Sequence, residues 1–374
     1  MSAEESSYNM QFGVLSCIGI VCVVMGHLDC DILTFGNWLP YASFHMPLFF
    51  FISGYFYKNN VEVRITIADY AIKLVKKLLI PFYIIYIIYY FIQQLLNIVF
   101  HCTFNFEKNF IFYIIAPFTR TQPVGFCSSA WFVITLLGVR FIHFCVQKVL
   151  WYLKKNKQTR ILITMLLYIA VGVLAFKYES RDLNGWERNI LKVCFGLSFY
   201  QIGIIYGMIE DEIDQVNDFV YFGLLILLRE MLWIRTGWGS ISFYNFGDVE
   251  EGYFPIVYSA MIGILIWARI ARYISENIKI NGLIIQIGKS TFEIMMHHLF
   301  VVFLLQGIGI AFYNTVFRGK FDIAAYKSSI YYLATDNPLL PITLSFISVL
   351  IISKYTIVKK YFKQKSFKKK TLAR

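Results

Sequence analysis

Charged residues are scarce in this chain. Only 16% of its 374 residues are Asp, Glu, Lys or Arg, whereas soluble domains usually contain about 25%. Hydrophobic residues make up 58% and aromatic residues 18%, and the mean hydropathy is +0.58. This balance excludes an ordinary soluble protein and predicts an integral membrane protein.

Cysteine pairs, repeats and linkers are also missing. The seven cysteines include no Cys-x-x-Cys pair, so no metal site or redox motif is predicted. Cys102 and Cys127 share a predicted outer loop, where a disulfide stays open as an alternative although free thiols are favoured. No repeat or low-complexity segment divides the chain. We therefore expect a single membrane domain over residues 1–358 and a basic tail over 359–374.

A cleavable signal peptide is not expected. The acidic start Met1-Ser2-Ala3-Glu4-Glu5 lacks a basic region, and no small-residue cleavage site follows the first apolar run. A membrane-spanning helix needs about 20 predominantly apolar residues. On that criterion we predict an all-α membrane protein with about ten transmembrane helices, near residues 12–28, 40–57, 78–100, 131–150, 161–177, 189–208, 218–234, 253–272, 291–313 and 339–358.

The basic residues predict the orientation of these helices. Nine Lys or Arg lie between Lys354 and the C-terminus, and cytoplasmic segments are the ones enriched in such residues. Both termini are therefore placed in the cytoplasm, and the predicted inner side then holds 23 Lys or Arg against ten outside. The acidic connection from Glu210 to Asp214 is unusual for an inner loop. Most of the excess positive charge lies next to predicted membrane helices. The net charge of +12 therefore indicates contact with membrane lipid rather than with nucleic acid.

Two histidines near the start of the chain are the first candidate site residues. Gly26-His27-Leu28 ends the first apolar segment, and the second segment contains His45 in Phe44-His45-Met46-Pro47. An ionisable side chain within a membrane is costly unless it faces a partner or a polar cavity. His27 is therefore a functional candidate, whereas His45 precedes a helix-breaking Met-Pro pair and is expected only to cap the helix or line a cavity mouth.

Five motifs follow one another along the chain. They are Val23-Val24-Met25-Gly26-His27, the segment from Phe44 to Tyr55, Lys73-Leu74-Val75-Lys76-Lys77-Leu78-Leu79-Ile80-Pro81, Ala130-Trp131-Phe132-Val133, and the segment from Ile287 to His298. In this order they make the chain resemble the acyltransferase-3 family of membrane proteins, which move acetyl and related acyl groups onto sugars and surface glycans. The resemblance extends over nearly the whole chain.

Three positions depart from the family pattern. Ser16 stands where the family usually has an Arg or Lys, eleven residues before His27. Lys76 and Lys77 replace the usual arginines, which keeps the charge but loses bidentate hydrogen bonding. Met295 replaces an aromatic residue. These changes affect how the donor would be bound more than which class of reaction is expected.

The reaction implied by this resemblance needs a base, hydrogen-bond donors for the oxyanion, and positive charge for the phosphates of the donor. His27 is the expected base, and Asp29 or Asp31 could orient it. Glu293 shares a helix face with His297, and His298 is turned by roughly 100° from His297. Glu293 with either histidine is a second catalytic candidate, against the alternative of a structural polar contact; by the resemblance, His298 matches the family histidine.

Other residues are expected to support the site or to line its cavity. Ser53 with Gly54 is first of all a device for close helix packing, and a nucleophilic Ser53 is the alternative. Arg140 lies about nine residues into its helix and should pair with a carboxylate or bind an anion, and Arg229 beside Glu230 raises the same question. The whole supporting set is Asp29, His45, Ser53, Trp131, Arg140 and His297.

Four basic residues on the predicted cytoplasmic side are candidates for binding acyl-coenzyme A through its phosphates. The alternative is that they only fix the topology. They are Arg64, Lys73, Lys76 and Lys77.

The sequence thus predicts a multi-pass enzyme of the bacterial cytoplasmic membrane, an O-acetyltransferase that takes acetyl from acetyl-coenzyme A and modifies a surface polysaccharide or its lipid-linked precursor. Acyl-coenzyme A acts as a substrate; no bound cofactor or metal is expected, and a homo-oligomer is allowed. With His27 near the outer end of its helix and Glu293 near the inner end of its own, an acyl relay through the membrane is a natural hypothesis. The alternatives are a transporter or flippase of lipid-linked glycan and a polysaccharide polymerase.

Overall fold

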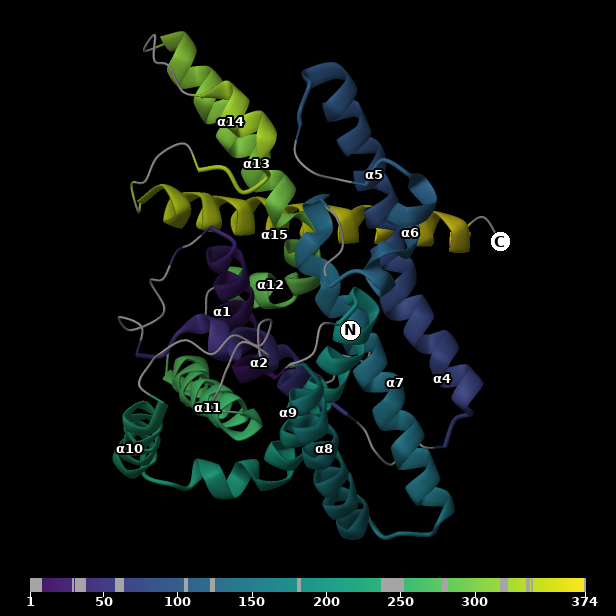
Figure 1. The fold of residues 1–374 in the computed structure, drawn as a ribbon, viewed down its shortest axis with the longest axis vertical. Coiled ribbons are helices and arrows are strands. Elements are labelled where there is room, and N and C mark those ends of the chain that lie inside the picture. Colours follow the sequence, from purple (N-terminus) through teal and green to yellow (C-terminus); the bar gives the residue numbers. More distant parts are fainter. Residues whose placement is uncertain are drawn as a thin grey trace. The chain divides into compact units, whose positions relative to one another are not determined.

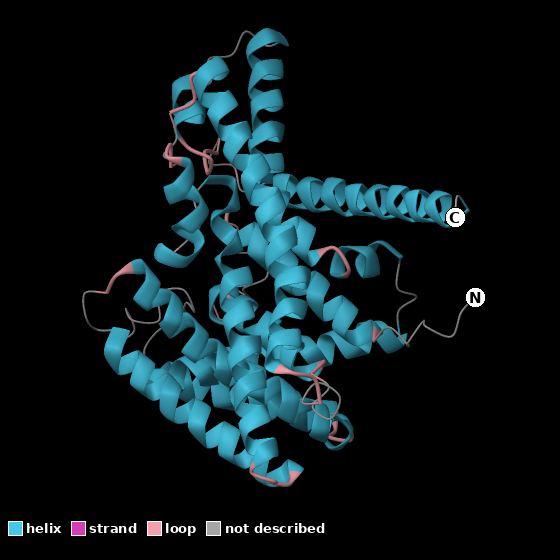
Figure 2. Ribbon diagram, turned by 90° about the vertical axis from the view of Figure 1, so that its right-hand side faces the viewer, coloured by secondary structure: helices cyan, strands magenta, loops and turns pink. Residues whose placement is uncertain are grey.

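The computed structural model describes residues 9–28, 30, 38–57, 64–103, 107–121, 125–179, 183–236, 252–277, 282–316, 322–333, 337 and 339–372. The regular structure in these ranges is helical, and no strand occurs within them (Figures 1 and 2). The predicted all-α class is confirmed. The chain forms two compact units, of which unit 1 comprises Met1–Cys30, Leu96–Asn105 and Ile270–Arg374, and unit 2 comprises Asp31–Leu95 and Phe106–Arg269.

Unit 1 is built around the first helix of the chain and the last long helices. The helix α1 begins where the Asn9 side chain accepts a hydrogen bond from the amide of Phe12, which satisfies a free N–H of the first turn. It packs against α12, α13 and α15. The helices of this unit are α1 (Met10–Gly26), α12 (Gly282–Gly288), α13 (Thr291–Val316), α14 (Ile323–Ser328) and α15 (Leu339–Leu372).

The contact between α1 and α12 brings two backbones together. A Cβ placed on Gly288 would lie 2.2 Å from the carbonyl oxygen of Gly13, so any residue other than glycine would push the helices apart. Farther along the unit, Leu28, Val302 and Leu344 form a buried apolar cluster that joins the end of α1 to α13 and α15. These contacts fix where the end of α1 lies against α13.

Unit 2 contains the remaining helices. A π-helical stretch, Val75–Leu79, interrupts the helix that carries the basic motif, and a short 3₁₀ helix, Gly125–Ala130, leads into α7. Helix α5 ends in unit 1, and so does α11. The helices are α2 (Tyr41–Tyr55), α4 (Ile67–Leu74), α5 (Ile80–Phe100), α6 (Phe110–Thr119), α7 (Trp131–Tyr152), α8 (Lys157–Glu179), α9 (Gly185–Asp214), α10 (Asp218–Thr236) and α11 (Tyr253–Asn277).

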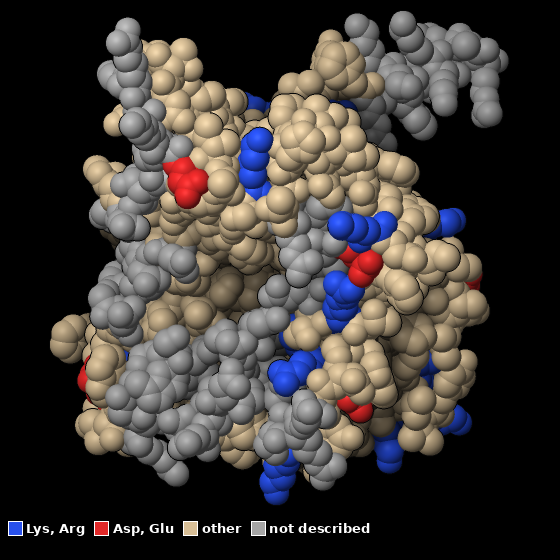
Figure 3. All heavy atoms as spheres, turned by 45° about the horizontal axis from the view of Figure 1, so that its top comes forward, with Lys and Arg blue, Asp and Glu red and all other residues tan. Residues whose placement is uncertain are grey.

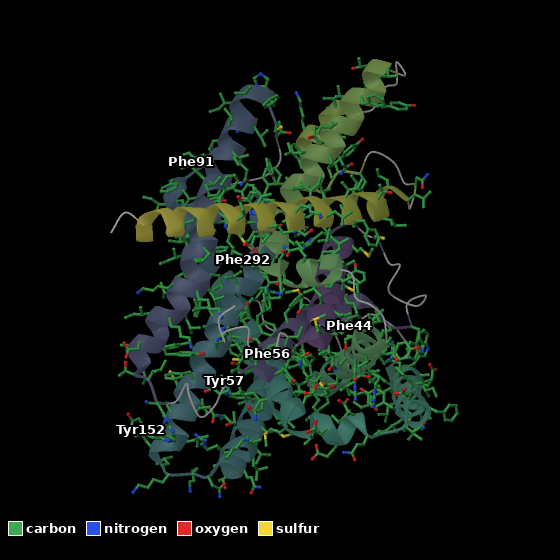
Figure 4. All side chains as sticks on the ribbon, turned by 180° about the vertical axis from the view of Figure 1, so that it is seen from behind. Phe44, Phe56, Tyr57, Phe91, Tyr152 and Phe292 are labelled. Atoms are coloured by element: carbon green, nitrogen blue, oxygen red, sulfur yellow. The ribbon has the colours of Figure 1, made fainter. Side chains whose placement is uncertain are left out.

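Helices α2 and α9 make the closest crossing in unit 2. A Cβ on Gly54 would lie 1.9 Å from the carbonyl oxygen of Tyr200, and one on Gly203 would lie 2.0 Å from that of Phe51. The expectation that Gly54 allows close helix packing is therefore confirmed, whereas the role of Ser53 stays a prediction. Nearer its start, α2 packs on α11, since the Cβ of Phe44 would lie 2.7 Å from a Cβ placed on Gly263 of α11. Phe44 is labelled in Figure 4.

Pro47 does not break α2. The helix runs from Tyr41 to Tyr55 with Pro47 inside it. A proline this close to a helix start removes one backbone hydrogen bond. The burial of Phe44, Leu48, Phe50 and Phe51 outweighs that loss. The predicted break after His45 is therefore wrong.

Six of the described helices are long and apolar enough to cross a membrane. They match six of the ten predicted segments and support a multi-pass membrane protein. The other four predicted segments are helical as well, but α1 and α2 have only 17 and 15 residues and are shorter than a usual span. The count of ten spans and the cytoplasmic termini stay predictions. The spans are Gly125–Tyr152, Lys157–Tyr178, Gly185–Asp214, Tyr253–Asn277, Thr291–Val316 and Leu339–Lys359.

The outer surface of α5 shows the same apolar character. Ile84, Ile88, Phe91 and Leu95 are each more than half exposed and recur every three or four residues, so they form one stripe. Phe91 is labelled in Figure 4. On the opposite face, Gln93 is fully buried. Charged side chains are sparse on the described part of the face drawn in Figure 3. An exposed apolar stripe opposite a buried glutamine fits a lipid surrounding.

Candidate functional site

His27 lies at the exact point where α1 ends. It is the C-cap residue of the helix, and its own amide donates to the carbonyl oxygens of the preceding turn. The amides of Leu28 and Cys30 both donate to the carbonyl of Met25, so the chain turns directly after the histidine. The C-terminal end of a helix carries a partial negative charge, which stabilises a cation placed there. An imidazole in this position is suited to accept a proton.

His298 lies against His27 within unit 1. The two ring centroids are 5.2 Å apart, with the ring planes tilted by 37° (Figure 1 shows α1 and α13, which carry them). His298 is completely buried. Two residues that are far apart in the sequence, and that were predicted as catalytic on separate grounds, are therefore brought together by the fold.

The hydrogen bonds of His298 fix its tautomer. Its Nδ1 lies 2.9 Å from the carbonyl oxygen of Ile294 and 3.0 Å from that of Met295. Carbonyl oxygens only accept, so Nδ1 carries a proton and donates it. In the neutral ring Nε2 is then the acceptor, and this buried atom has no hydrogen-bond partner within the described residues. The ring therefore keeps one acceptor nitrogen available within the unit.

Glu293 lies in the first turn of α13, where the helix dipole favours a carboxylate. Its Oε1 is 3.6 Å from the Nζ of Lys359 on α15. His297 is half-buried and meets the ring of Tyr355 edge-on, with centroids 5.9 Å apart. The expected face shared by Glu293 and His297 is thus turned toward α15, whereas the neighbouring His298 is turned toward α1.

The predicted separation of His27 from Glu293 is wrong. Glu293 precedes His298 by five residues, which is about 7.5 Å along a helix axis. Because the His27 ring lies beside that of His298, His27 is level with the second turn of α13. The physical reason is how the two helices pack, since α1 lies against α13 and its end meets the second turn of that helix. Asp29 and Asp31, the expected orienting groups, lie outside the described residues.

The four residues expected to bind the donor belong to unit 2. All four side chains are exposed: Arg64 precedes α4, Lys73 lies in α4 with its Nζ 5.6 Å from the ring centroid of Tyr70, and Lys76 and Lys77 lie in the π-helical stretch. Single π-helical turns are rare and occur often at functional sites. Exposure leaves the lysine ammonium groups accessible to an anion.

The supporting residues of unit 2 are held by local contacts. His45 places its Nδ1 2.6 Å from the carbonyl oxygen of Tyr41, one turn earlier in α2. Trp131 is buried, and the Nζ of Lys192 lies 4.4 Å from its ring centroid. Arg140 is half-buried in α7. Cys102 of unit 1 and Cys127 of unit 2 are both free thiols.

Arg229, which the sequence analysis expected to pair with a carboxylate or bind an anion, donates a hydrogen bond to the backbone. Its guanidinium is buried, and its Nε donates to the carbonyl of Trp38 at 2.8 Å. The indole N–H of Trp38 donates in turn to Glu230 at 2.5 Å. Arg229 and Glu230 therefore connect Trp38, three residues before α2, to α10, which is a structural role.

The sequence analysis missed two residues, Lys192 and Tyr331. Lys192 is 1% exposed and donates to the carbonyl of Thr121 at 2.9 Å. A lone lysine within an apolar helix is a signal that could have marked it as a polar contact. Tyr331, in contrast, lies in a segment without helical periodicity. Its ring stacks on that of His27, with centroids 6.0 Å apart and planes 23° from parallel. No signal in the sequence marks this contact.

Comparison with known proteins identifies the family. The model of the acyltransferase-3 family, described as an acyltransferase domain, matches residues 13–357. No curated protein and no solved structure gave a significant match. The matched range includes α1, α13 and both histidines of the ring pair. Since it extends over nearly the whole chain, this protein belongs to the acyltransferase-3 family.

Proposed function

We propose that this protein is a membrane O-acyltransferase that moves an acetyl or similar short acyl group from acyl-coenzyme A to a hydroxyl of a surface polysaccharide or its lipid-linked precursor. The single observation that carries the proposal is the pair of rings, His27 and His298, at 5.2 Å in a chain of an acyltransferase family. The apolar helices support a multi-pass membrane location, which we take to be the bacterial cytoplasmic membrane.

His27 is the general base of the proposed reaction. A neutral imidazole takes the proton of the acceptor hydroxyl as its oxygen attacks the thioester carbonyl. A C–O bond forms, the C–S bond breaks, and the proton passes from His27 to the departing thiolate, which leaves as coenzyme A. The imidazolium that exists between these events lies at the C-terminal end of α1, where the helix dipole stabilises it by about 0.3–1 kcal/mol.

His298 and Glu293 assist from α13. His298 has its proton committed to two backbone carbonyls, so its ring is held in one orientation beside His27. Its Nε2 can accept a hydrogen bond from the protonated base or from the acceptor hydroxyl. We assign Glu293 to the thioester end of the donor, where its carboxylate keeps 18% of its side-chain surface exposed beside Lys359.

The donor's phosphates are assigned to the basic residues around α4. Arg64, Lys73, Lys76 and Lys77 are exposed and lie within a short stretch of chain, which supports electrostatic binding of a phosphate-bearing donor. The lysines at 76 and 77 bind as point charges rather than through a bidentate fork. We therefore expect donor affinity to be strongly dependent on salt.

The test is release of coenzyme A by the purified full chain in lipid, given acetyl-coenzyme A and surface polysaccharide from the source organism. His27→Ala should abolish polysaccharide-dependent release, and His298→Ala should reduce it by about 10²- to 10⁴-fold, as for a group that assists proton transfer. His101→Asn is the matched control. His101 is exposed and adopts a φ of 53°, which asparagine also tolerates, so activity should be kept.

A thermal unfolding curve for each variant separates lost chemistry from lost folding. Release that persists in folded His27→Ala contradicts the assignment of the base. If the folded parent neither binds acetyl-coenzyme A nor releases coenzyme A, the acyltransferase proposal fails and transport of a lipid-linked glycan becomes the better hypothesis.

A further inference from the structure

Tyr331 is an accessible ring neighbour of His27. The two rings are nearly parallel, with centroids 6.0 Å apart, and Tyr331 is 41% exposed. His298, whose ring also lies beside His27, is 0% exposed. A substrate that approaches His27 along the ring of His298 would have to displace a packed helix. Approach along Tyr331 requires no such change.

The segment around Tyr331 is anchored rather than loose. The amide of Tyr331 donates to the Ser329 hydroxyl at 3.1 Å, and the carbonyl of Tyr332 accepts a hydrogen bond from Gln306 of α13. Leu333 packs against the apolar cluster that joins α1 to α13 and α15. These contacts hold the Tyr331 ring in place on both sides along the chain. A fixed aromatic ring can orient a bound group at little cost in conformational entropy.

An acceptor sugar has the chemistry that such a ring binds. A pyranose presents an apolar face of C–H groups, which packs on an aromatic ring, and hydroxyls around its edge, which bond to polar groups. Tyrosine offers both, because its ring is apolar and its phenol is polar. A general base must lie within about 2.6–3.2 Å of the hydroxyl oxygen that it deprotonates. With centroids 6.0 Å apart, the imidazole and the phenol ring do not overlap fully. A sugar packed on the part of the Tyr331 face that the imidazole leaves uncovered has its edge hydroxyls beside that imidazole.

We infer that Tyr331 is the acceptor-positioning residue of this enzyme, with its ring as the platform for the sugar that is acylated. This inference rests on the proposed function, because it assigns the acceptor side of the same site. It goes beyond that function by naming which surface of the site recognises the carbohydrate. The donor side, assigned to the basic residues of unit 2, is independent of it.

The experiment compares two adjacent tyrosines. Tyr331→Leu and Tyr332→Leu each replace an aromatic ring by an apolar side chain of good bulk, but only Tyr331 has a ring contact with His27. Tyr331→Phe keeps the ring and removes the phenol. For each full-length variant in lipid, coenzyme A release is measured against the concentration of surface polysaccharide and, separately, of acetyl-coenzyme A. Hydrolysis of acetyl-coenzyme A without polysaccharide is the third readout.

Tyr331→Leu should raise the half-saturating polysaccharide concentration by about tenfold, as expected for loss of one stacking contact. The half-saturating concentration of acetyl-coenzyme A and the hydrolysis without polysaccharide should stay within about twofold of the parent. Tyr331→Phe should stay within about threefold in every readout, because it retains the platform. Tyr332→Leu should leave the dependence on polysaccharide unchanged.

Three results overturn the inference. The first is an unchanged dependence on polysaccharide in Tyr331→Leu. The second is an equal loss in all three readouts, which would mean that the ring only supports His27. The third is a Tyr331→Phe variant as impaired as Tyr331→Leu, which would contradict the ring as a platform. Failure of the proposed function looks different, because parent protein would then release no coenzyme A with any acceptor, and the inference about Tyr331 would fall with it.

Discussion

Substitution of Gly54 by alanine tests the closest helix crossing of unit 2. The added Cβ would lie 1.9 Å from the carbonyl oxygen of Tyr200, and real Cβ atoms essentially never come within 3.0 Å of another heavy atom. Going from 1.9 Å to 3.0 Å requires a local separation of at least 1.1 Å. The obstacle is backbone, so no side-chain rotation can provide this space. Helix α2 must move away from α9.

The cost follows from what that movement undoes. Overpacking that forces a backbone shift costs about 1–3 kcal/mol, and here the apolar contacts along the crossing loosen with it. Gly→Ala in an unobstructed helix is favourable by about 1 kcal/mol. Because the obstacle is backbone, we expect the upper part of the net range: Gly54→Ala should lower the free energy of unfolding by about 1–2 kcal/mol. Gly203→Ala should do the same, because its Cβ would lie 2.0 Å from the carbonyl of Phe51.

The double variant makes the prediction sharper. Gly54 and Gly203 face each other's helices at one crossing, so a single separation of α2 from α9 relieves both clashes. The double variant should therefore cost much less than twice a single variant, with a coupling energy of about 1–2 kcal/mol. Additive costs would mean that the two glycines do not share one crossing.

Thermal unfolding of the purified protein in detergent is the assay, with Gly223→Ala as the control. Gly223 lies in α10, and a Cβ there meets nothing within 4 Å, so this variant should melt at or slightly above the parent temperature. A Gly54→Ala variant as stable as Gly223→Ala would refute the geometry of the crossing.

Three further outcomes concern charged groups and a thiol. Glu293→Gln and Lys359→Gln break the same partly exposed ion pair, so each should change the free energy of unfolding by at most about 1 kcal/mol. Only Glu293→Gln should reduce coenzyme A release. Equal losses of activity in the two variants would assign Glu293 a structural role. Lys192→Met leaves the carbonyl of Thr121 without its buried donor and should lower the unfolding free energy by about 1–3 kcal/mol in the same thermal assay. Burial raises the pKa of the Cys102 thiol, although Lys327 opposes the shift. In a variant that keeps only this cysteine, alkylation at pH 8.5 should therefore be slower than for a cysteine peptide, and its rate should increase as the pH rises. An alkylation rate equal to that of the peptide would contradict the burial of Cys102.

The sequence predicted helices well where apolar length alone decides. The segments that became α8, α9, α13 and the first part of α15 are long, apolar and free of competing signals, and each is a helix. Apolar length also predicted the helix near 40–57 correctly, whereas the expectation that Pro47 breaks it failed, because the cost of a missing hydrogen bond is set against how much apolar surface α2 buries. Burial depends on partners that a single segment does not reveal.

The candidate site was predicted in its members but not in its geometry. The ordered motifs pointed to His27 and His298 separately, and the fold pairs them. Their contact depends on where α1 stops and on the approach of Gly13 to Gly288, neither of which is encoded in one short motif. Tyr331 was missed for the same reason, since a tertiary contact made by an irregular segment leaves no periodic pattern.

The contact between the end of α1 and the second turn of α13 changes what an acyl relay would have to do. A relay between opposite membrane surfaces requires two chemical stations separated by about 30 Å of hydrocarbon. His27 lies beside His298, and His298 is only about 7.5 Å along α13 from Glu293. If both His27 and Glu293 act in the transfer, as proposed, they act at one station, and no residue has to hand the acyl group across the membrane. One substrate must then cross the membrane on its way to that station, through the path taken by the donor's acyl end or by the acceptor's hydroxyl. Substrate access, rather than a chain of acylated residues, therefore sets the sidedness of the reaction.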